Sequence, residues 1–182
     1  MFGHKPKFYS SPLESNDHPE FDTSEQLDLN DTKKYQSMIG SLQWAVSLGR
    51  LDINTAVMTM SSFRAYPRRG HLKRLQRIYG YLAKFSQSAI TIRTEEPDYS
   101  NIIVNKYEWE NTIYGEVKEL QPNDMPPSLG KPVTLTTYID ANLYHDMLTG
   151  RSVSGILHLV NKTPFDWYSK KTIYGRNSNI WQ

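Results

Sequence analysis

Three apolar stripes follow one another between residues 31 and 87, and each repeats at the spacing of an α-helix. The pattern predicts helices over about residues 32–48, 53–66 and 70–85. Asp31 and Asp52 are the expected N-caps of the first two, and Gly49 is typical of a helix end. Because helices of this length are unstable alone, we expect the three to pack together.

β-branched and aromatic residues replace the helical pattern between residues 131 and 171. They predict three short strands, at about 133–139, 152–160 and 165–169. Short connections between neighbouring strands favour an antiparallel meander. The sequence therefore predicts an α+β fold in which helices and strands are segregated. A further β-like run lies at residues 89–93.

The remaining residues predict connections rather than packed elements. Residues 1–30 are rich in Ser, Pro, Asp and Glu, and indicate an acidic linker or tail. Residues 88–130 are poorly patterned and proline-rich, as a connection would be, and residues 172–182 form an aberrant tail without a pattern. The expected units are a helical segment at 31–87 and a partial sheet at 131–171.

Composition excludes several kinds of site. The chain has no cysteine, which rules out disulfides, thiolate metal sites and a cysteine nucleophile. The longest uncharged stretch, residues 35–49, is too short and too polar to span a bilayer. Residues 1–11 lack the apolar core of a signal peptide, so we expect an intracellular protein.

Charge is strongly segregated along the chain. Between Lys7 and Lys33 there are seven acidic residues and no Lys or Arg, whereas residues 53–94 hold eight basic residues and no acid. A helix with one apolar side and one basic side free of acidic residues can lie along a phosphate backbone. The candidate nucleic-acid-binding residues are Arg64, Arg68, Arg69, His71, Lys73, Arg74, Arg77 and Lys84. A solvated helical face is the alternative interpretation.

One carboxylate has a place that suits metal binding. Asp140 ends the apolar run at residues 135–139, and a carboxylate at a strand end can hold a divalent cation. Taken alone, Asp140 is more often a turn residue, because Asp favours turns. The five histidines are dispersed, and none is spaced as a close zinc pair.

Residues 35–44 are YQSMIGSLQW, and residues 50–57 are RLDINTAV. They resemble YxSxxGSLxY and RPDIxxAV in the Pol polyproteins of copia-type retrotransposons, with Leu51 in place of proline. Residues 67–82 resemble PxxxHWxAxKRILRYL, with leucine where tryptophan is usual. The resemblance implies that these helices form the thumb-like region after the polymerase palm.

The second half continues the resemblance in the same order. Residues 138–142, YIDAN, resemble the YSDADWAG of the first ribonuclease H strand. Residues 150–155 resemble RKSTSG, and residues 167–171, WYSKK, resemble WxSKKQ. This resemblance implies an incomplete ribonuclease H-like sheet with Asp140 as its first metal-binding carboxylate. It also implies Mg²⁺ as the cofactor of the intact family and an RNA–DNA hybrid as its partner.

Departures from the family pattern limit the expected activity. The family continues with a run containing a second carboxylate, but no Asp or Glu follows Asp166 here. The palm aspartates are also missing upstream. Two metal ions need several converging carboxylates, so we expect a truncated reverse transcriptase and ribonuclease H fragment that catalyses nothing alone.

Three interpretations stay open at this point. The first is an inert retroelement remnant with weak nucleic-acid affinity through its basic helix. The second is a ribonuclease H fragment that is active only when another chain supplies the missing carboxylates. The third is a small structural domain with no nucleic-acid role.

Overall fold

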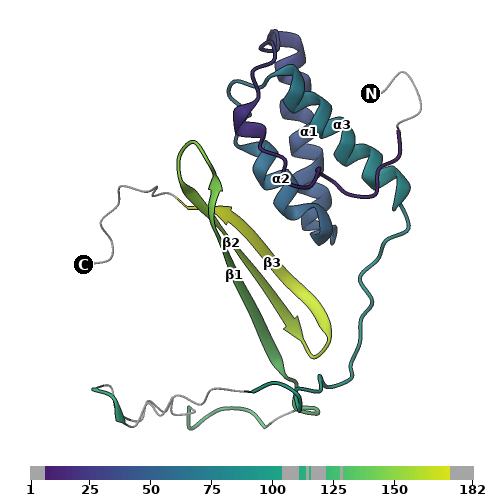
Figure 1. Ribbon diagram of the computed structural model, residues 1–182. Helices are drawn as coiled ribbons and strands as arrows, with labels where there is room; N and C mark the ends of the chain where they lie inside the picture. The colour runs from purple at the N-terminus through teal and green to yellow at the C-terminus, as the bar shows by residue number, and fades with distance from the viewer. Residues whose placement is uncertain (1–6, 104–110, 114, 116–121, 128, 173–182) are drawn as a thin grey trace.

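The computed structural model describes residues 7–103, 111–113, 115, 122–127 and 129–172. Its helices are α1 (Leu29–Ser47), α2 (Asn54–Ser61) and α3 (Arg69–Lys84), with short 3₁₀ turns at Pro19–Phe21 and Leu51–Ile53. Its strands are β1 (Leu135–Asp146), β2 (Arg151–Val160) and β3 (Thr163–Lys171). The helices form one unit and the strands a separate sheet, which confirms the α+β prediction (Figure 1).

Local hydrogen bonds explain where the helices begin and end. The Oδ1 of Asp28 accepts the Asp31 N–H at 2.8 Å, so α1 begins earlier than the sequence predicted, and Asp28 is its cap. Gly49 has a φ of +117°, a conformation that glycine adopts without strain, and it follows the end of α1 as predicted. Asp52 is not a helix cap, because it lies in a 3₁₀ turn and pairs with Arg50 at 2.9 Å.

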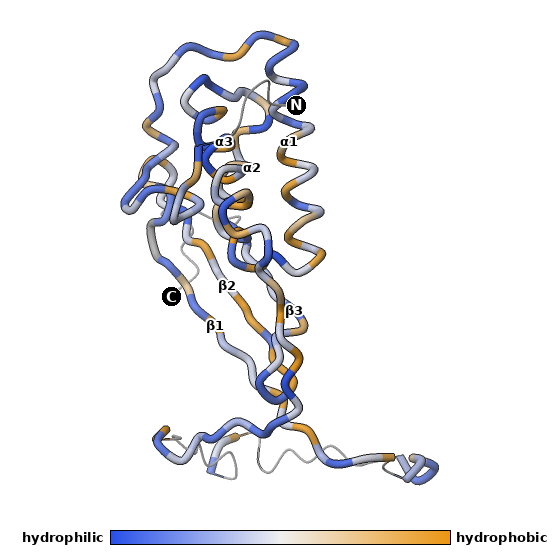
Figure 2. The backbone as a smooth tube through the Cα atoms, turned by 90° about the vertical axis from the view of Figure 1, so that its right-hand side faces the viewer, coloured by the Kyte–Doolittle hydropathy of each residue, from blue (hydrophilic) through white to orange (hydrophobic). Residues whose placement is uncertain are grey.

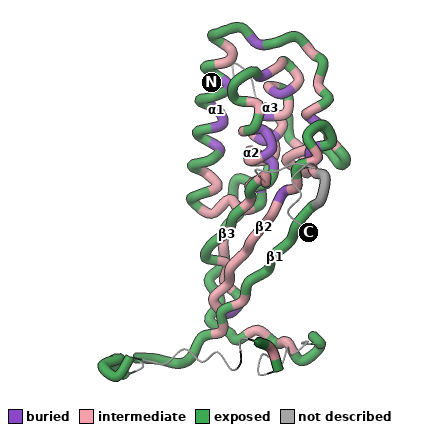
Figure 3. The backbone as a smooth tube through the Cα atoms, turned by 90° about the vertical axis from the view of Figure 1, so that its left-hand side faces the viewer, coloured by how far each residue is buried: buried purple, intermediate pink, exposed green. Residues whose placement is uncertain are grey.

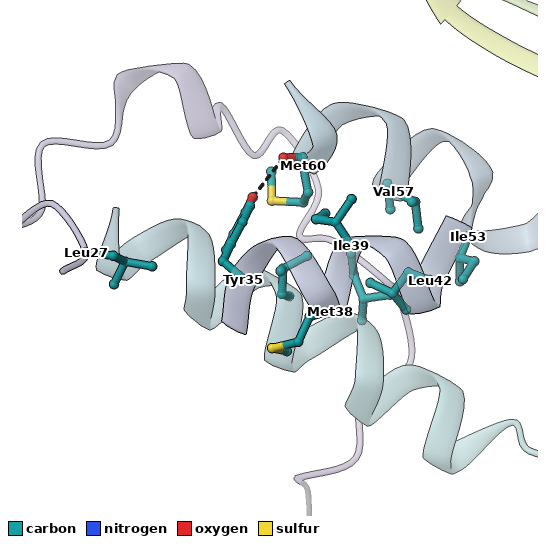
Figure 4. Close-up of a cluster of buried hydrophobic side chains, with 11 residues drawn as sticks. Leu27, Tyr35, Met38, Ile39, Leu42, Ile53, Val57 and Met60 are labelled. Carbon is teal, nitrogen blue, oxygen red and sulfur yellow. Dashed lines mark hydrogen bonds between the residues drawn. The ribbon is translucent and has the colours of Figure 1, made fainter. Parts of the chain in front are cut away.

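The core lies entirely within the helical unit (Figure 4). Its buried apolar residues are Leu27, Tyr35, Met38, Ile39, Leu42, Ile53, Ala56, Val57, Met60, Leu75 and Ile78. The Tyr35 hydroxyl donates a hydrogen bond to the Met60 carbonyl at 2.8 Å, so the one polar group of this side chain is satisfied inside the core. Burial raises the pKa of Tyr35 above its ordinary value.

The sheet is an antiparallel meander in the order β1-β2-β3, as the sequence predicted. Asn161 fixes the turn between β2 and β3 with a φ of +53°. Asn161 also forms two hydrogen bonds with Thr134. Its backbone N–H donates to the Thr134 carbonyl at 2.7 Å, and its side-chain oxygen accepts the Thr134 N–H at 2.9 Å. The β-like run at 89–93 forms no strand. Its Arg93 N–H donates to the Thr163 hydroxyl, and that hydroxyl donates to the Arg93 carbonyl.

Much of the sheet is open to solvent. Buried positions gather in the helical unit, whereas the strands are mostly exposed or half-buried (Figure 3). Val153 is the one buried apolar residue among the described side chains of the strands, and Ile139 is 73% exposed. Hydrophobic residues nevertheless run along β2 (Figure 2). The Trp167 indole donates to the Val46 carbonyl at 3.2 Å and ties β3 to α1.

Residues 7–28, the acidic segment from here on, pack against the helices although the sequence predicted a linker or tail. Pro19 and Leu27 are buried, and backbone hydrogen bonds join Leu27 N–H to the Pro67 carbonyl and Arg69 N–H to the Glu25 carbonyl. The physical reason is that its carboxylates pair with basic residues far along the chain. The pattern of residues within the segment gives no sign of these distant partners.

Two other expectations reach residues outside the described ranges. Of the tail predicted at 172–182, only Thr172 is described. The described residues of 88–130 contain no helix and no part of β1, β2 or β3. In the described part of the chain, no helix has the length and apolar character needed to cross a bilayer.

Candidate nucleic-acid interface and the Asp140 carboxylate

Arg74 sits at the centre of the contact between α3 and the acidic segment. Its guanidinium donates to both oxygens of Asp17, at 2.8 to 3.1 Å, and to Asp22 at 2.6 Å. All three side chains are largely shielded from water, with 23%, 13% and 8% of the Arg74, Asp17 and Asp22 side chains exposed. Burial raises the pKa of Asp22, but hydrogen bonds from Ser24 and Arg74 outweigh it and hold that pKa below its usual value.

Other basic residues of α3 also have partners in the acidic segment. Arg77 pairs with Glu14 at 2.9 Å, and Arg69 pairs with Glu25 at 2.8 Å. The Arg68 side chain donates to the Ser24 carbonyl at 2.6 Å, and the Lys84 ammonium donates to the Ser10 hydroxyl at 2.8 Å. With Arg74, and with His71 through the Pro19 carbonyl, six of the eight predicted nucleic-acid-binding residues therefore contact this chain's own N-terminal segment.

Two glycines of α3 let the acidic segment approach the helix closely. A Cβ on Gly80 would lie 2.1 Å from the Lys7 carbonyl oxygen, and one on Gly70 would lie 1.7 Å from the Asp22 carboxylate. A side chain at Gly80 would require the backbone of the segment to move, and one at Gly70 would require the Asp22 side chain to move. The same segment that supplies the counter-charges is thus packed against the helix at both ends.

His71 does not belong to the exposed basic face. It is buried and stacks on Phe63, with 4.1 Å between the ring centroids. Its Nδ1 accepts the Arg68 N–H at 3.1 Å and its Nε2 donates to the Pro19 carbonyl at 3.0 Å, which defines the neutral tautomer. In this structure His71 presents no group to an outside phosphate, and it is a helix cap for α3.

We expect stability to fall as pH drops below about 6.5, because burial lowers the pKa of His71 below its ordinary value of 6.5. The unfolded chain takes up a proton near pH 6.5 that the folded chain resists, so stability is complete above that pH and declines below it. Urea unfolding at pH 7.5 and pH 5.5 measures the loss. The His71→Gln variant should show a smaller difference between the two pH values, and an equal difference would contradict the assignment.

Four of the predicted residues are exposed: Arg64, Arg69, Lys73 and Lys84. Arg69 and Lys84 contact the acidic segment, whereas no contact with it is described for Arg64 and Lys73. Neither makes an ion pair with any residue in the described ranges. Sequence reasoning did not identify Asp17 and Asp22 as the partners of α3. The signal was present, because an acid-only run and a basic-only run in one chain are complementary, but nothing in the sequence showed that they meet.

Asp140 lies in β1 opposite Gly155, with its side chain exposed. The nearby Asp146 forms an ion pair with Lys171 and accepts the N–H groups of Leu148 and Thr149 at 3.0 Å. Burial alone would raise the pKa of Asp146, yet Lys171 and Thr149 lower it to about 2. Asp146 therefore fastens the β1–β2 turn to β3 and has its oxygens already engaged.

Asp140 belongs to no cluster of candidate metal ligands among the described residues. Within those ranges, no group of three or more His, Asp or Glu side chains could hold a metal ion. Mg²⁺ and Ca²⁺ require several oxygen ligands, and the described residues do not supply such a set at Asp140.

A polar hollow of about 320 Å³ lies where the acidic segment, α2 and the end of β1 meet. His18 and His145 both line it, although they are far apart in sequence. The His145 Nε2 lies 3.3 Å from the Thr59 hydroxyl, and the Met147 N–H donates to Glu20 at 3.2 Å. These contacts place the β1–β2 turn against both the acidic segment and α2.

Comparison with known proteins gives one relative. The chain is 30% identical over 129 residues to a protein of Saccharomyces cerevisiae named as a transposon Ty5-1 protein. The aligned region covers 71% of this chain and 38% of that protein, so the chain spans about two fifths of the length of its relative. No family model matches the chain, and no solved structure matches it significantly.

Proposed function

We propose that the chain is a fragment of a copia-type retrotransposon Pol polyprotein, joining the end of the reverse transcriptase to the first strands of ribonuclease H. The observation that carries the proposal is the order of the elements. A three-helix unit with the thumb-like motifs precedes a three-strand antiparallel meander whose first strand contains Asp140. The similarity to the yeast transposon protein supports a retrotransposon origin.

The proposed activity is weak, sequence-independent binding of nucleic acid through the basic side of the helical unit. Arg64 and Lys73 are exposed cations without a described ion pair, so they can meet a phosphate backbone. Such contacts position a protein on nucleic acid without reading its sequence. Because Arg68, Arg69, Arg74 and Arg77 are engaged within the chain, the affinity of the isolated protein should be low and strongly dependent on salt.

The chain alone is not expected to hydrolyse RNA. In the intact family, Mg²⁺ activates water and stabilises the leaving oxygen, and converging carboxylates hold it. Here Asp140 would be one ligand, while Asp146 is held by Lys171. The second candidate function, hydrolysis once another chain supplies the missing carboxylates, is favoured by the exposed position of Asp140.

Binding is tested with a labelled RNA–DNA hybrid by fluorescence anisotropy at 50 and 200 mM salt. The Arg64→Gln/Lys73→Gln variant should bind more weakly than wild type, and its dependence on salt should be shallower by about two phosphate contacts. The matched control is Lys131→Gln/Lys170→Gln, which removes two exposed charges elsewhere. Equal weakening by both variants would mean that net charge alone governs binding.

Cleavage is tested with the same hybrid and Mg²⁺, comparing wild type with Asp140→Asn. We expect no cleavage by either protein. Cleavage that the Asp140→Asn substitution abolishes would overturn the proposed inactivity and favour ligands supplied by a second copy of the chain.

A further inference from the structure

We propose that the acidic segment is an intramolecular competitor of nucleic acid, occupying the α3 surface that would otherwise bind the phosphate backbone. The inference rests on the proposed nucleic-acid binding and adds its regulation. In the structure, carboxylates of residues 14–25 lie where phosphates would lie on a basic helix. Full engagement of α3 by a polyanion therefore requires the segment to leave.

The charge arrangement supports competition. The acidic segment meets three arginines of α3 through four carboxylates, as Arg69–Glu25, Arg74–Asp17, Arg74–Asp22 and Arg77–Glu14 pairs. In the Arg74–Asp17 pair, the guanidinium donates hydrogen bonds to both carboxylate oxygens. Arginine binds phosphate oxygens with the same bidentate geometry. A carboxylate and a phosphate cannot occupy the same fork, so the two ligands exclude each other.

The way the segment is held allows it to be displaced. Glu14 and Glu25 are 71% and 72% exposed, and exposed ion pairs contribute little to stability. Leu27 holds the end of the segment next to α1 in the core, whereas Phe8 and Phe21 are about half exposed. Between them, the shielded ion pairs of Arg74 with Asp17 and Asp22 are electrostatic contacts. A dense polyanion competes directly with contacts of this kind.

Gly70 and Gly80 provide a test that changes no charge. The Gly70→Ala/Gly80→Ala variant should push the segment off α3, because the added Cβ atoms would overlap Asp22 and the Lys7 backbone. The matched control is Gly40→Ala, a helical glycine of α1 where an added Cβ meets nothing within 4 Å. All three proteins carry the same charge, so a difference in hybrid binding cannot come from net charge.

We expect the double variant to bind the RNA–DNA hybrid roughly tenfold more tightly than wild type. In the variant, no free energy is needed to release the acidic segment from α3 before the hybrid binds. Gly40→Ala should bind as wild type does. The salt dependence of the double variant should also be steeper, because the freed arginines each add a phosphate contact with a slope of about −0.9.

The outcomes separate the two proposals. If wild type and the double variant bind equally and both lose affinity with Arg64→Gln/Lys73→Gln, nucleic-acid binding stands and the competition is wrong. If none of the proteins binds, the proposed binding fails, and the segment is a structural part of the fold.

Hydrogen exchange of the wild-type protein keeps the inference testable if the double variant does not fold. The Leu27 N–H donates to the Pro67 carbonyl and the Arg69 N–H donates to the Glu25 carbonyl, so both bonds exist only while the segment is docked. Adding hybrid should speed the exchange of these two N–H groups while the rest of α3 stays protected. Unchanged or slower exchange with bound hybrid would overturn the competition.

Discussion

Ile78→Ala will lower the free energy of unfolding by about 2–5 kcal/mol, because the loss of buried methyl groups combines with the cavity that remains. Ile78 is 0% exposed and lies in α3 facing the core of the helical unit. Its removal weakens the packing that holds α3 against α1 and α2. Urea unfolding followed by far-ultraviolet circular dichroism measures the change in midpoint.

Ile92→Ala is the matched control, because it removes the same atoms from a side chain that is 80% exposed. It should change stability by less than about 0.5 kcal/mol. A loss below about 1 kcal/mol for Ile78→Ala would contradict the described core. Since this core contains no strand residue, we further expect the cooperative transition to report the helical unit.

Arg74→Ala will lower the free energy of unfolding by about 2–4 kcal/mol, because it leaves two shielded carboxylates without their partner. The Asp17 and Asp22 side chains are 13% and 8% exposed and both bond to the Arg74 guanidinium. Arg74→Lys should lose less, since it keeps the charge but not the fork that reaches both carboxylates. The same unfolding measurement at pH 7 compares the variants.

Lys73→Ala, the neighbouring residue on α3, controls for the loss of a positive charge and should stay within about 0.5 kcal/mol of wild type. The difference between wild type and Arg74→Ala should also shrink as pH falls below 3.8. The folded pKa of Asp22 lies below that ordinary value, so its stabilisation is complete above pH 3.8 and is lost as the carboxylate protonates. A constant difference down to pH 2 would contradict the described pairing.

Helical periodicity predicted the three helices, because a stripe repeating every 3.6 residues is a local property of the sequence. It also predicted the three-strand meander, from β-branched runs and short turns. The start of α1 lies a few residues before the predicted one, where Asp28 replaces Asp31 as the cap. The β-like run at 89–93 forms no strand, because such a run forms a strand only when another strand pairs with it.

The candidate site also combines features that the sequence determined with features that only the tertiary structure decided. The sequence determined that a basic helix and a separate acidic run exist. It placed Asp140 at the end of a strand, whereas β1 continues beyond Asp140 to Asp146. Only the tertiary structure decided that Arg74 meets Asp17, 57 residues earlier, and that His71 points inward. Local patterns predict local structure, whereas the partner of a charge depends on how distant segments of the chain fold back on one another.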